Sequence, residues 1–360
     1  MPRILIVGAG VIGLTTALEL RDKLPLESYE IVICSMELPG DSPGADGKGV
    51  GLLYASPRAG AHWSSPTELP DPRIAHWQLV SYRKFSKLSR IPNAWVKPFD
   101  LYCGQIPGPD GMAPPFKEPW YRDAVENFQY IGEDQKKFPG VKNIFRFRSF
   151  TISTTFYLLY LMNQLTDRGV KIHRKTIQSL EEPLSKGYDL VINCCGYGAK
   201  SLVTDLPKEA EKMTAVRGHT ILVENNLPYQ VLFEELSPDE EGEFLMLFPR
   251  KEGGAVLGGI YDSHSPYLDT TVHEDYVERL KIRASKHLPD LFKVPNPSYV
   301  KILNHSLGFR PHRIGGARVE RDSRNSKIIH NYGSGNSGYI ESWGCADDAV
   351  ELAGQLQPKL

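Results

Sequence analysis

The sequence has few cysteines and no pattern that would pair them. Its 360 residues include 5 Cys, an odd number, and two of them are adjacent. Neither the spacing of a zinc ribbon nor the framework of a small disulfide-rich secreted domain is present. These absences argue against a fold held together by disulfides and favour a reducing compartment. The cysteines are Cys34, Cys103, Cys194, Cys195 and Cys345.

Long hydrophobic runs and an excess of one charge are also missing. No stretch approaches the ~20 apolar residues that cross a bilayer, and the apolar start at residues 4–7 is too short for a signal peptide. The formal net charge is -1, so no global field attracts nucleic acid or an anionic membrane. Metal-ligand spacing such as His-Glu-x-x-His is absent as well. We therefore expect no nucleic-acid, membrane or metal binding.

What remains is the composition of a globular protein, with 41% hydrophobic and 24% charged residues. A chain of 360 residues is long enough for two domains, each with its own core. Residues 4–7 read as a short buried strand, residues 11–24 as a helix that Pro25 would end, and residues 29–34 as a second strand. Such a strand–helix–strand unit predicts a mononucleotide-binding half.

A glycine fingerprint joins the first strand to the first helix. Residues 8–13 read Gly-Ala-Gly-Val-Ile-Gly and match the pattern Gly-x-Gly-x-x-Gly. Gly8 permits a tight turn, Gly10 lets backbone amides approach a pyrophosphate, and Gly13 allows close packing of helix on strand. In this context the fingerprint predicts a dinucleotide cofactor.

The acid that usually binds the ribose at the end of the second strand is harder to place. Ser35 and Met36 stand where that acid is normally found, and Glu37 comes one or two residues later. This departure leaves the ribose contacts open and does not separate FAD from NAD.

Later segments predict how the fold is completed. Helices are expected at residues 76–88, 156–165, 274–287 and 343–356. Strands at 170–173, 189–193 and 328–332 would extend the first sheet, whereas runs at 220–223, 244–248 and 255–261 are divided by turn residues, as in an antiparallel sheet. We expect an α/β fold with a discontinuous Rossmann-like domain (1–55, 150–205 and 305–360). A second, α+β substrate-binding and interface domain on an antiparallel sheet would comprise 56–149 and 206–304.

Four further segments carry a family resemblance. They are Ala-Ser-Pro-Arg-Ala-Gly-Ala-His-Trp at 55–63, Asn-Cys-Cys-Gly-Tyr-Gly-Ala-Lys at 193–200, Gly-Phe-Arg-Pro-His-Arg at 308–313, and the glycine-rich stretch 330–344. Together with the fingerprint, in this order and spacing, they resemble the D-amino acid oxidase family from residue 4 to about 352. The resemblance implies that FAD is the cofactor and that the α-hydrogen of a D-amino acid passes to the flavin as hydride. Water would hydrolyse the imino acid to a 2-oxo acid and ammonia, and dioxygen would yield hydrogen peroxide.

The resemblance also implies which residues bind FAD. The pyrophosphate would lie on the first glycine turn, segments 55–56 and 60–61 beside the isoalloxazine ring, and residue 177 near the adenine. The turn at 333–340 would face the flavin pyrimidine end, where backbone amides can stabilise negative charge. The implied cofactor-binding residues are Gly8, Ala9, Gly10, Val11, Ile12, Gly13, Ser35, Ala55, Ser56, Gly60, Ala61, Ile177, Gly335, Gly338, Tyr339 and Ile340.

Two residues are expected to hold the substrate for catalysis. Arg310 can bind an α-carboxylate through two parallel hydrogen bonds. Tyr261 stands where yeast-type members carry a second carboxylate contact, whereas the relative specific for D-aspartate has an arginine. The tyrosine favours neutral or apolar substrate side chains.

Two further positions qualify this expectation. Met246 replaces a carboxylate-binding tyrosine of most members, and losing that hydroxyl removes about 1–3 kcal/mol if it bonds a charged group. Asn336 lies near the substrate amino group, and its amide leaves D-aspartate or D-glutamate open as substrates. Hydride transfer requires no general base, so the histidines need not act as acid–base catalysts; they include His62, His219, His305 and His312.

Several alternatives remain open at this point. A D-aspartate or D-glutamate oxidase is the near alternative, and an NAD-dependent dehydrogenase on the same fingerprint or a non-catalytic binding module is more distant. A homodimer is expected because dimers are common in the family. The end Pro358-Lys359-Leu360 is similar to the Ser-Lys-Leu peroxisomal address, so the expected location is peroxisomal or cytoplasmic.

Overall fold

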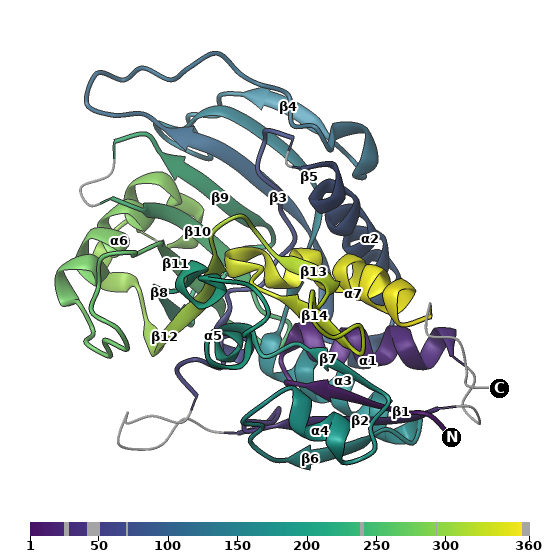
Figure 1. Ribbon diagram of the computed structural model, residues 1–360. Helices are drawn as coiled ribbons and strands as arrows, with labels where there is room; N and C mark the ends of the chain where they lie inside the picture. The colour runs from purple at the N-terminus through teal and green to yellow at the C-terminus, as the bar shows by residue number, and fades with distance from the viewer. Residues whose placement is uncertain (25–28, 42–50, 70, 238–240, 293, 355–360) are drawn as a thin grey trace.

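The computed structural model describes residues 1–24, 29–41, 51–69, 71–237, 241–292 and 294–354. Its strands form two sheets, one of six strands and one of eight (Figure 1). Residues 358–360, which are similar to a peroxisomal address, lie outside the described residues. Within those ranges, no helix combines the length and apolar character that crossing a bilayer requires. All five cysteines are free thiols.

The six-stranded sheet has the order β13-β14-β7-β1-β2-β6. Its neighbours pair in parallel except β13 and β14, which are antiparallel. The strands β1, β2, β7 and β14 are almost wholly buried, which explains their continuous apolar sequences. The prediction that the C-terminal part of the chain completes the first sheet is confirmed. The bounds are β1 Arg3–Val7, β2 Glu30–Ser35, β6 Lys171–Arg174, β7 Leu190–Asn193, β13 Arg318–Arg321 and β14 Ile328–Tyr332.

The eight-stranded sheet has the order β12-β8-β11-β10-β9-β3-β5-β4. It is antiparallel, as predicted, except that β3 and β9 pair in parallel. The predicted runs at 220–223, 244–248 and 255–261 lie in β8, β10 and β11, although Tyr261 itself follows the end of β11. The boundaries of the two domains stay a prediction. The bounds are β3 Val96–Ile106, β4 Gln129–Gly132, β5 Lys142–Ile152, β8 Met213–Val223, β9 Gln230–Glu235, β10 Glu243–Pro249, β11 Ala255–Ile260 and β12 Ile302–Arg313.

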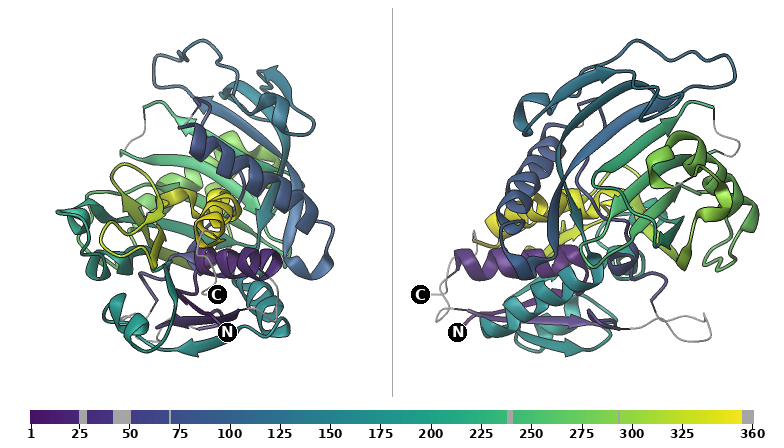
Figure 2. Two further views of the ribbon diagram at one scale, coloured as in Figure 1. Left: turned by 45° about the vertical axis from the view of Figure 1, so that its right-hand side comes forward. Right: turned by 180° about the vertical axis from the view of Figure 1, so that it is seen from behind.

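Three helices connect the sheets. Helix α1 (Val11–Lys23) packs on β1 and β2, α7 (Gly338–Gly354) packs on α1, and α2 (Pro72–Leu88) packs on α7 and on strands β3 and β5. Figure 2 shows α2 lying against the larger sheet. This stack of helices holds the two sheets in a defined relation, and a cavity lined by residues of both sheets lies at the start of α1.

The remaining helices lie at the periphery. Helix α3 (Thr154–Asp167) packs against α1, and α6 (Glu274–His287) packs on β10 of the larger sheet. The short helices are α4 (Glu181–Ser185) and α5 (Ala199–Leu202). Single 3-10 turns occupy Ser56–Arg58, Pro92–Ala94, Arg122–Ala124, Gly196–Gly198, Glu209–Lys212, Pro289–Leu291, Pro297–Tyr299 and Gly335–Ser337.

Helix ends explain most differences from the predicted bounds. Helix α2 begins at Pro72 rather than residue 76 because Asp71 caps it, its side chain accepting from the Arg73 amide at 2.8 Å. Helix α7 begins at Gly338 rather than at 343, so its first turn belongs to the glycine-rich segment. Its described part ends at Gly354.

The contact between α2 and α7 depends on Gly344. A Cβ atom at this position would lie 2.1 Å from the Trp77 Cα atom and 2.5 Å from the Trp77 carbonyl oxygen. Backbone atoms cannot move aside as a flexible side chain does, so only glycine allows this approach. At Gly354 in the same helix, such a Cβ would have no heavy atom of the described part of the chain within 4 Å, apart from its own chain neighbours and helix backbone.

Replacing Gly344 by alanine should therefore destabilise the protein, whereas Gly354→Ala should not. We expect the first change to lower the free energy of unfolding by about 1–3 kcal/mol through overpacking. The second should leave it within about 1 kcal/mol, since alanine is favoured in a helix. Urea unfolding of both variants measures this difference, and equal stability of the two would contradict the proposed close contact.

Candidate active site

One large cavity lies where the carboxyl ends of β1 and β7 meet the larger sheet. Its volume is about 770 Å³, towards the upper end of the range for small-molecule sites. Strands β8, β10 and β12 contribute its far wall, and the glycine-rich segment before α7 contributes another. Segments far apart in the sequence therefore share one site.

The structure brings the predicted site residues together. All of them line this cavity except Gly13, which lies behind it. A Cβ at Gly13 would lie 2.0 Å from the Gly8 carbonyl oxygen, so this glycine allows α1 to pack on the first turn. The lining residues that were predicted are Gly8, Ala9, Gly10, Val11, Ile12, Ser35, Ala55, Ser56, Gly60, Ala61, Ile177, Met246, Tyr261, Arg310, Gly335, Asn336, Gly338, Tyr339 and Ile340.

The first glycine turn forms a cradle of backbone atoms. Gly8 has a φ of 112°, and a Cβ there would lie 2.4 Å from the Cys194 carbonyl oxygen. The start of α1 lines the cavity, so the positive end of the helix dipole faces it, and the first turn contains no acidic residue that would offset that charge. The Ser56 hydroxyl accepts from the Val11 amide at 2.9 Å. The arrangement is suited to an anion such as a phosphate.

Two residues beside this turn add to the predicted site: Tyr54 was not predicted from the sequence, and the role of Glu37 was left open. Tyr54 donates its hydroxyl to the Ala9 carbonyl at 2.7 Å and lines the cavity. Glu37 is buried and is the one carboxylate among the described lining residues. Burial and the nearby Asp41 raise its pKa, although Arg58 lowers it in part. Strand β2 ends at Ser35, and the chain then turns, which brings Glu37 into the wall despite its late position.

Arg310 lies on β12 with its guanidinium held by backbone. Its Nη1 donates to the Arg217 carbonyl at 2.9 Å and its Nη2 to the Ile260 carbonyl at 3.1 Å. Gly218 leaves the room for it, since a Cβ there would lie 2.7 Å from Nη1. Burial lowers the pKa of Arg310, but an arginine keeps its proton in proteins. Within the described residues it forms no ion pair with a carboxylate.

Tyr261 lies directly against this cation. The Arg310 Cζ atom is 5.1 Å from the centre of the Tyr261 ring, a distance at which the ring face attracts a cation. The Tyr261 hydroxyl is 3.1 Å from Nδ1 of His312. Burial raises the pKa of Tyr261 while Arg310 opposes that shift. The phenol is therefore neutral at physiological pH.

The wall beside Arg310 and Tyr261 is apolar. The Met246 methyl group fills the space above three glycines, 3.1, 2.9 and 3.4 Å from Cβ positions built at Gly60, Gly258 and Gly259. Phe244, Phe248 and Leu232 line the same cavity. Asn336 also lines it, but its side chain is exposed, so it lies at the rim.

His62 stacks on Phe248, with ring centres 3.9 Å apart and an interplanar angle of 21°. Burial and the charge of Arg250 lower the pKa of His62 to about 3, so this imidazole is neutral. Its Nδ1 atom is buried and has no hydrogen-bond partner among the described residues. An imidazole with so low a pKa is too weak a base to shuttle protons near neutral pH.

Comparisons with known proteins agree with this geometry. The family model described as FAD dependent oxidoreductase matches residues 3–352. The chain belongs to the FAD-dependent oxidoreductase family. It is 31% identical to a D-amino-acid oxidase of Schizosaccharomyces pombe, covering 97% of this chain and 95% of that protein. It is 29% identical to a D-aspartate oxidase of Talaromyces thermophilus, covering 98% and 95%.

A solved structure supports the fold of this FAD-dependent oxidoreductase. The glycine oxidase of Bacillus cereus superposes with a TM-score of 0.72 at 13% identity, covering 99% of this chain and 96% of that one. The predicted fold class and family are confirmed. FAD is confirmed as the cofactor, and the NAD-dependent alternative is wrong.

The residues present fit FAD. The anion-binding cradle at Gly8, Gly10 and the α1 terminus would hold the pyrophosphate, and Glu37, the one described acid in the wall, would meet a ribose. Ala59–Ala61 and Gly335–Ile340 would hold the ring, because both segments line the cavity and their glycine and alanine residues allow close approach. FAD supplies the two-electron acceptor.

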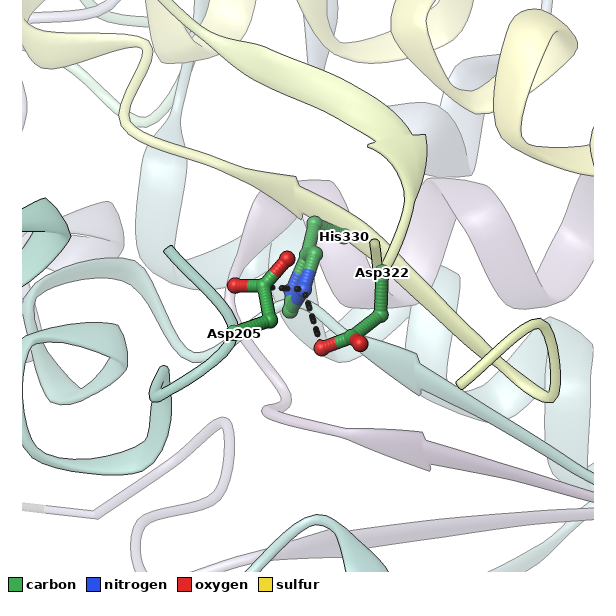
Figure 3. A group of neighbouring side chains, drawn as sticks. All are labelled: Asp205, Asp322 and His330. Carbon is green, nitrogen blue, oxygen red and sulfur yellow. Dashed lines mark hydrogen bonds and ion pairs between the residues drawn. The ribbon is translucent and has the colours of Figure 1, made fainter. Parts of the chain in front are cut away.

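Two acids and a histidine form a separate cluster outside this cavity. Asp205, Asp322 and His330 lie close enough to share a metal ion (Figure 3). However, both carboxylate oxygens of Asp205 accept from Arg318, at 2.9 and 2.6 Å. His330 Nε2 lies 3.2 Å from Asp322. Since the guanidinium already neutralises Asp205 and would repel a second cation, we interpret the cluster as an ion-pair network that joins β13 and β14 to the loop after α5.

The carboxyl of Glu341 lies in the first turn of α7, behind the glycine-rich segment, and is 4% exposed. Burial raises its pKa to about 7, and contacts with Ser334, Gln78 and Ser337 oppose that shift only in part. The folded protein therefore keeps a proton that the unfolded chain releases near its ordinary pKa of about 4.3. The stability that protonated Glu341 contributes is therefore fully present below about pH 4.3, and it is lost as the pH rises towards 7.

Glu341→Gln should therefore stabilise the oxidoreductase at high pH. The gain should be on the order of 3 kcal/mol at pH 8 and should vanish near pH 4, where wild type is also protonated. Thermal unfolding of the FAD-bound protein across this range measures it. Glu351→Gln, at an exposed position of the same helix, is the control. A difference in stability between wild type and Glu341→Gln that does not depend on pH would contradict a raised pKa of the buried Glu341 carboxyl.

Proposed function

We propose that the enzyme oxidises D-amino acids with neutral, apolar side chains to 2-oxo acids, ammonia and hydrogen peroxide. Dioxygen is the second substrate. The name of the Schizosaccharomyces pombe relative, D-amino-acid oxidase, supports the stereochemistry and the reaction. The geometry of the cavity supports the chemical class of the substrate.

The observation that carries the proposal is the unpaired charge of Arg310. An arginine has five N–H donors, and the structure gives partners to two of them, the carbonyls of Arg217 and Ile260. The remaining donors are available to a planar anion in the cavity that this residue lines. A carboxylate fits because it pairs with a guanidinium through two parallel hydrogen bonds.

The rest of the wall supports a neutral side chain. Met246, Phe244, Phe248 and Leu232 offer no polar partner to a second carboxylate. Among the described lining residues the other basic side chains are Arg58 and Lys175. Arg58 donates to the carbonyls of Gly51 and Leu307 at 2.7 and 2.9 Å, and Glu37 opposes its charge. Lys175 lies beside Ser35, to whose carbonyl its amide donates at 2.8 Å.

The residues act by orienting the substrate. Arg310 and Tyr261 hold the carboxylate at one point, while the apolar wall receives the side chain. The amino group and the α-hydrogen are then fixed by the tetrahedral carbon, so one face of the substrate meets the cofactor. Such orientation supplies up to ~7–11 kcal/mol in favourable cases. No described lining residue is placed as a general base, because burial lowers the pKa of His62 to about 3, which makes it a weak base, and Glu37 lies on the ribose side.

A D-aspartate or D-glutamate oxidase remains the second candidate. The name of the Talaromyces thermophilus relative supports it, and the exposed amide of Asn336 at the rim offers a donor to a side-chain carboxylate. The lack of a further unpaired cation beside Arg310 among the described residues favours the neutral class.

Two other expectations stay predictions. A homodimer is proposed from the family resemblance, and residues 358–360, which carry the proposed peroxisomal address, lie outside the described residues. Light scattering of the purified protein and localisation with and without the last three residues would test them.

Arg310→Met should abolish productive substrate binding while leaving the cofactor in place. We expect the second-order rate constant of anaerobic flavin reduction by D-alanine to fall by about 10²–10⁴, since two charge-assisted hydrogen bonds are lost. Arg310→Lys should recover only part of it, because a point charge lacks the planar fork. The flavin absorbance of each variant reports cofactor content.

The same experiment includes a panel of D- and L-amino acids. Reduction of wild type by D-alanine and D-methionine but not by L-alanine is the expected result. Faster reduction by D-aspartate would move the assignment to the second candidate. Unchanged reduction of the Arg310→Met variant would overturn the proposed carboxylate site.

A further inference from the structure

The hydrogen bond between Tyr261 and His312 has a consequence for substrate binding. We propose that His312 is a positioning residue that sets the direction of the Tyr261 hydroxyl proton, so that binding of the substrate carboxylate is coupled to proton uptake by His312. The inference rests on the proposed function of Arg310 and Tyr261 as the carboxylate site. It assigns a role to a side chain that does not itself line the cavity.

The fold places the two rings together from different strands. Tyr261 follows β11, and its amide donates to the Gly242 carbonyl at 2.9 Å. His312 lies two residues after Arg310 on β12 and therefore on the same face of that strand. The hydroxyl oxygen and Nδ1 are 3.1 Å apart, and the rings meet edge to face at 86°.

The glycine-rich segment closes the other side of the imidazole. His312 forms an antiparallel bridge with Ser334. A Cβ at Gly335 would lie 3.2 Å from Nδ1 of His312, so the small residue at this point leaves space for the ring. The imidazole is thus held between the carboxylate site and the segment proposed to face the flavin.

A hydroxyl has one proton, and the charge state of His312 decides where it points. A neutral imidazole nitrogen is more basic than a phenol oxygen, and a phenol O–H is more acidic than a neutral imidazole N–H. Tyr261 therefore donates to neutral His312 and presents only lone pairs to a carboxylate. When His312 is protonated, its Nδ1–H becomes the donor. The Tyr261 proton is then free to turn towards the carboxylate.

The single proton of the Tyr261 hydroxyl determines the sign of the coupling. An arriving carboxylate accepts from this hydroxyl, which is available to it only when Nδ1 of His312 is itself the donor. Binding of the carboxylate and protonation of the imidazole therefore favour each other. Affinity for a carboxylate should therefore fall as the pH rises and His312 loses its proton.

Three neighbouring positions bear on the charge around His312. Thr214 faces it across the pairing with β8 and is uncharged. Arg313 on its own strand is paired with Glu209, Nε to Oε1 at 2.6 Å. Glu341 lies behind the segment that carries Ser334, and burial raises its pKa to about 7. Glu341 is thus the second group that titrates near this site, and the test must separate it from His312.

The test uses propionate, which is alanine without its amino group and so has no ammonium to titrate and cannot be deaminated. Its dissociation constant for the FAD-bound enzyme, expressed for the propionate anion, is measured from the flavin absorbance change at several values between about pH 5 and 9. We expect the constant for wild type to rise by about tenfold or more over this range, because one hydrogen bond to a charged group is lost.

Four variants isolate the pair. In His312→Ala the pH dependence should disappear, since nothing competes for the Tyr261 proton. In Tyr261→Phe the pH dependence should also disappear. The affinity of this variant for propionate should equal the weak affinity that wild type has at high pH. The double variant should equal Tyr261→Phe, because His312 acts only through the hydroxyl. Glu341→Gln should keep the wild-type dependence.

A second histidine on the same strand serves as the matched control. His305 pairs with His219 at 3.1 Å rather than with Tyr261, so His305→Ala should keep the dependence on pH. A dependence that survives in His312→Ala, or that disappears in Glu341→Gln, would overturn the inference. A flat wild-type curve would overturn it too, since it would mean that Nδ1 carries the proton in the neutral state.

The outcome is distinguishable from failure of the proposed function. If D-amino acids reduce the flavin but His312→Ala leaves the propionate curve unchanged, only the role of His312 is wrong. If no amino acid reduces the flavin, the proposed function fails whatever the curve shows. If wild type does not bind propionate at all, the carboxylate site and the role of His312 both fail.

Discussion

The Arg310 guanidinium carries its charge in a protein wall where no described carboxylate neutralises it. Arg310 is half-buried, and withdrawing a charge from water without a counter-ion is costly. Two backbone carbonyls offset part of that cost. Those carbonyls come from Arg217 on β8 and from Ile260 on β11. The strands of the larger sheet must therefore keep their register for the cation to be held. The active site is a product of that sheet and not of a local motif.

Backbone and small side chains build much of the rest of the cavity. Gly8 allows the turn under the Cys194 carbonyl, Gly218 leaves room for the guanidinium, and Gly335 leaves room for His312. In each case the neighbour is an atom that a Cβ would displace. This distribution explains why a chain with an ordinary composition concentrates glycine at particular positions: a large flat cofactor needs backbone amides at close range.

The sequence predicted a helix or strand correctly where the apolar pattern of that segment alone was enough to identify it. The β1–α1–β2 unit, helix α6 at Glu274–His287 and strand β14 at Ile328–Tyr332 follow from apolar runs and glycine punctuation. Strands β3 and β5 were missed, although β5 alternates polar and apolar residues around Phe145 and Phe147. Pro98 and the many prolines and glycines that follow β3 masked a strand whose partners lie far away in sequence.

Glu37 and His312 show a different limit. The sequence left the ribose contact open because Glu37 comes late after β2, and the turn that follows Ser35 brings it into the wall. His312 was considered only as an acid–base catalyst, and nothing in its sequence context shows that Tyr261 lies 3.1 Å away. Contacts between β11, β12 and the segment before α7 depend on how three strands and a loop meet.

By itself, the sequence determined the cofactor-binding turn, the discontinuous sheet and the residue types that could hold a carboxylate, because each depends on short-range spacing and on what glycine and arginine can do. Only the tertiary structure decided which arginine stays unpaired, which acid faces the cavity and which histidine reaches the tyrosine. Ion pairing, burial and hydrogen-bond direction are relations between distant segments, and they exist only once the two sheets have closed around the same space.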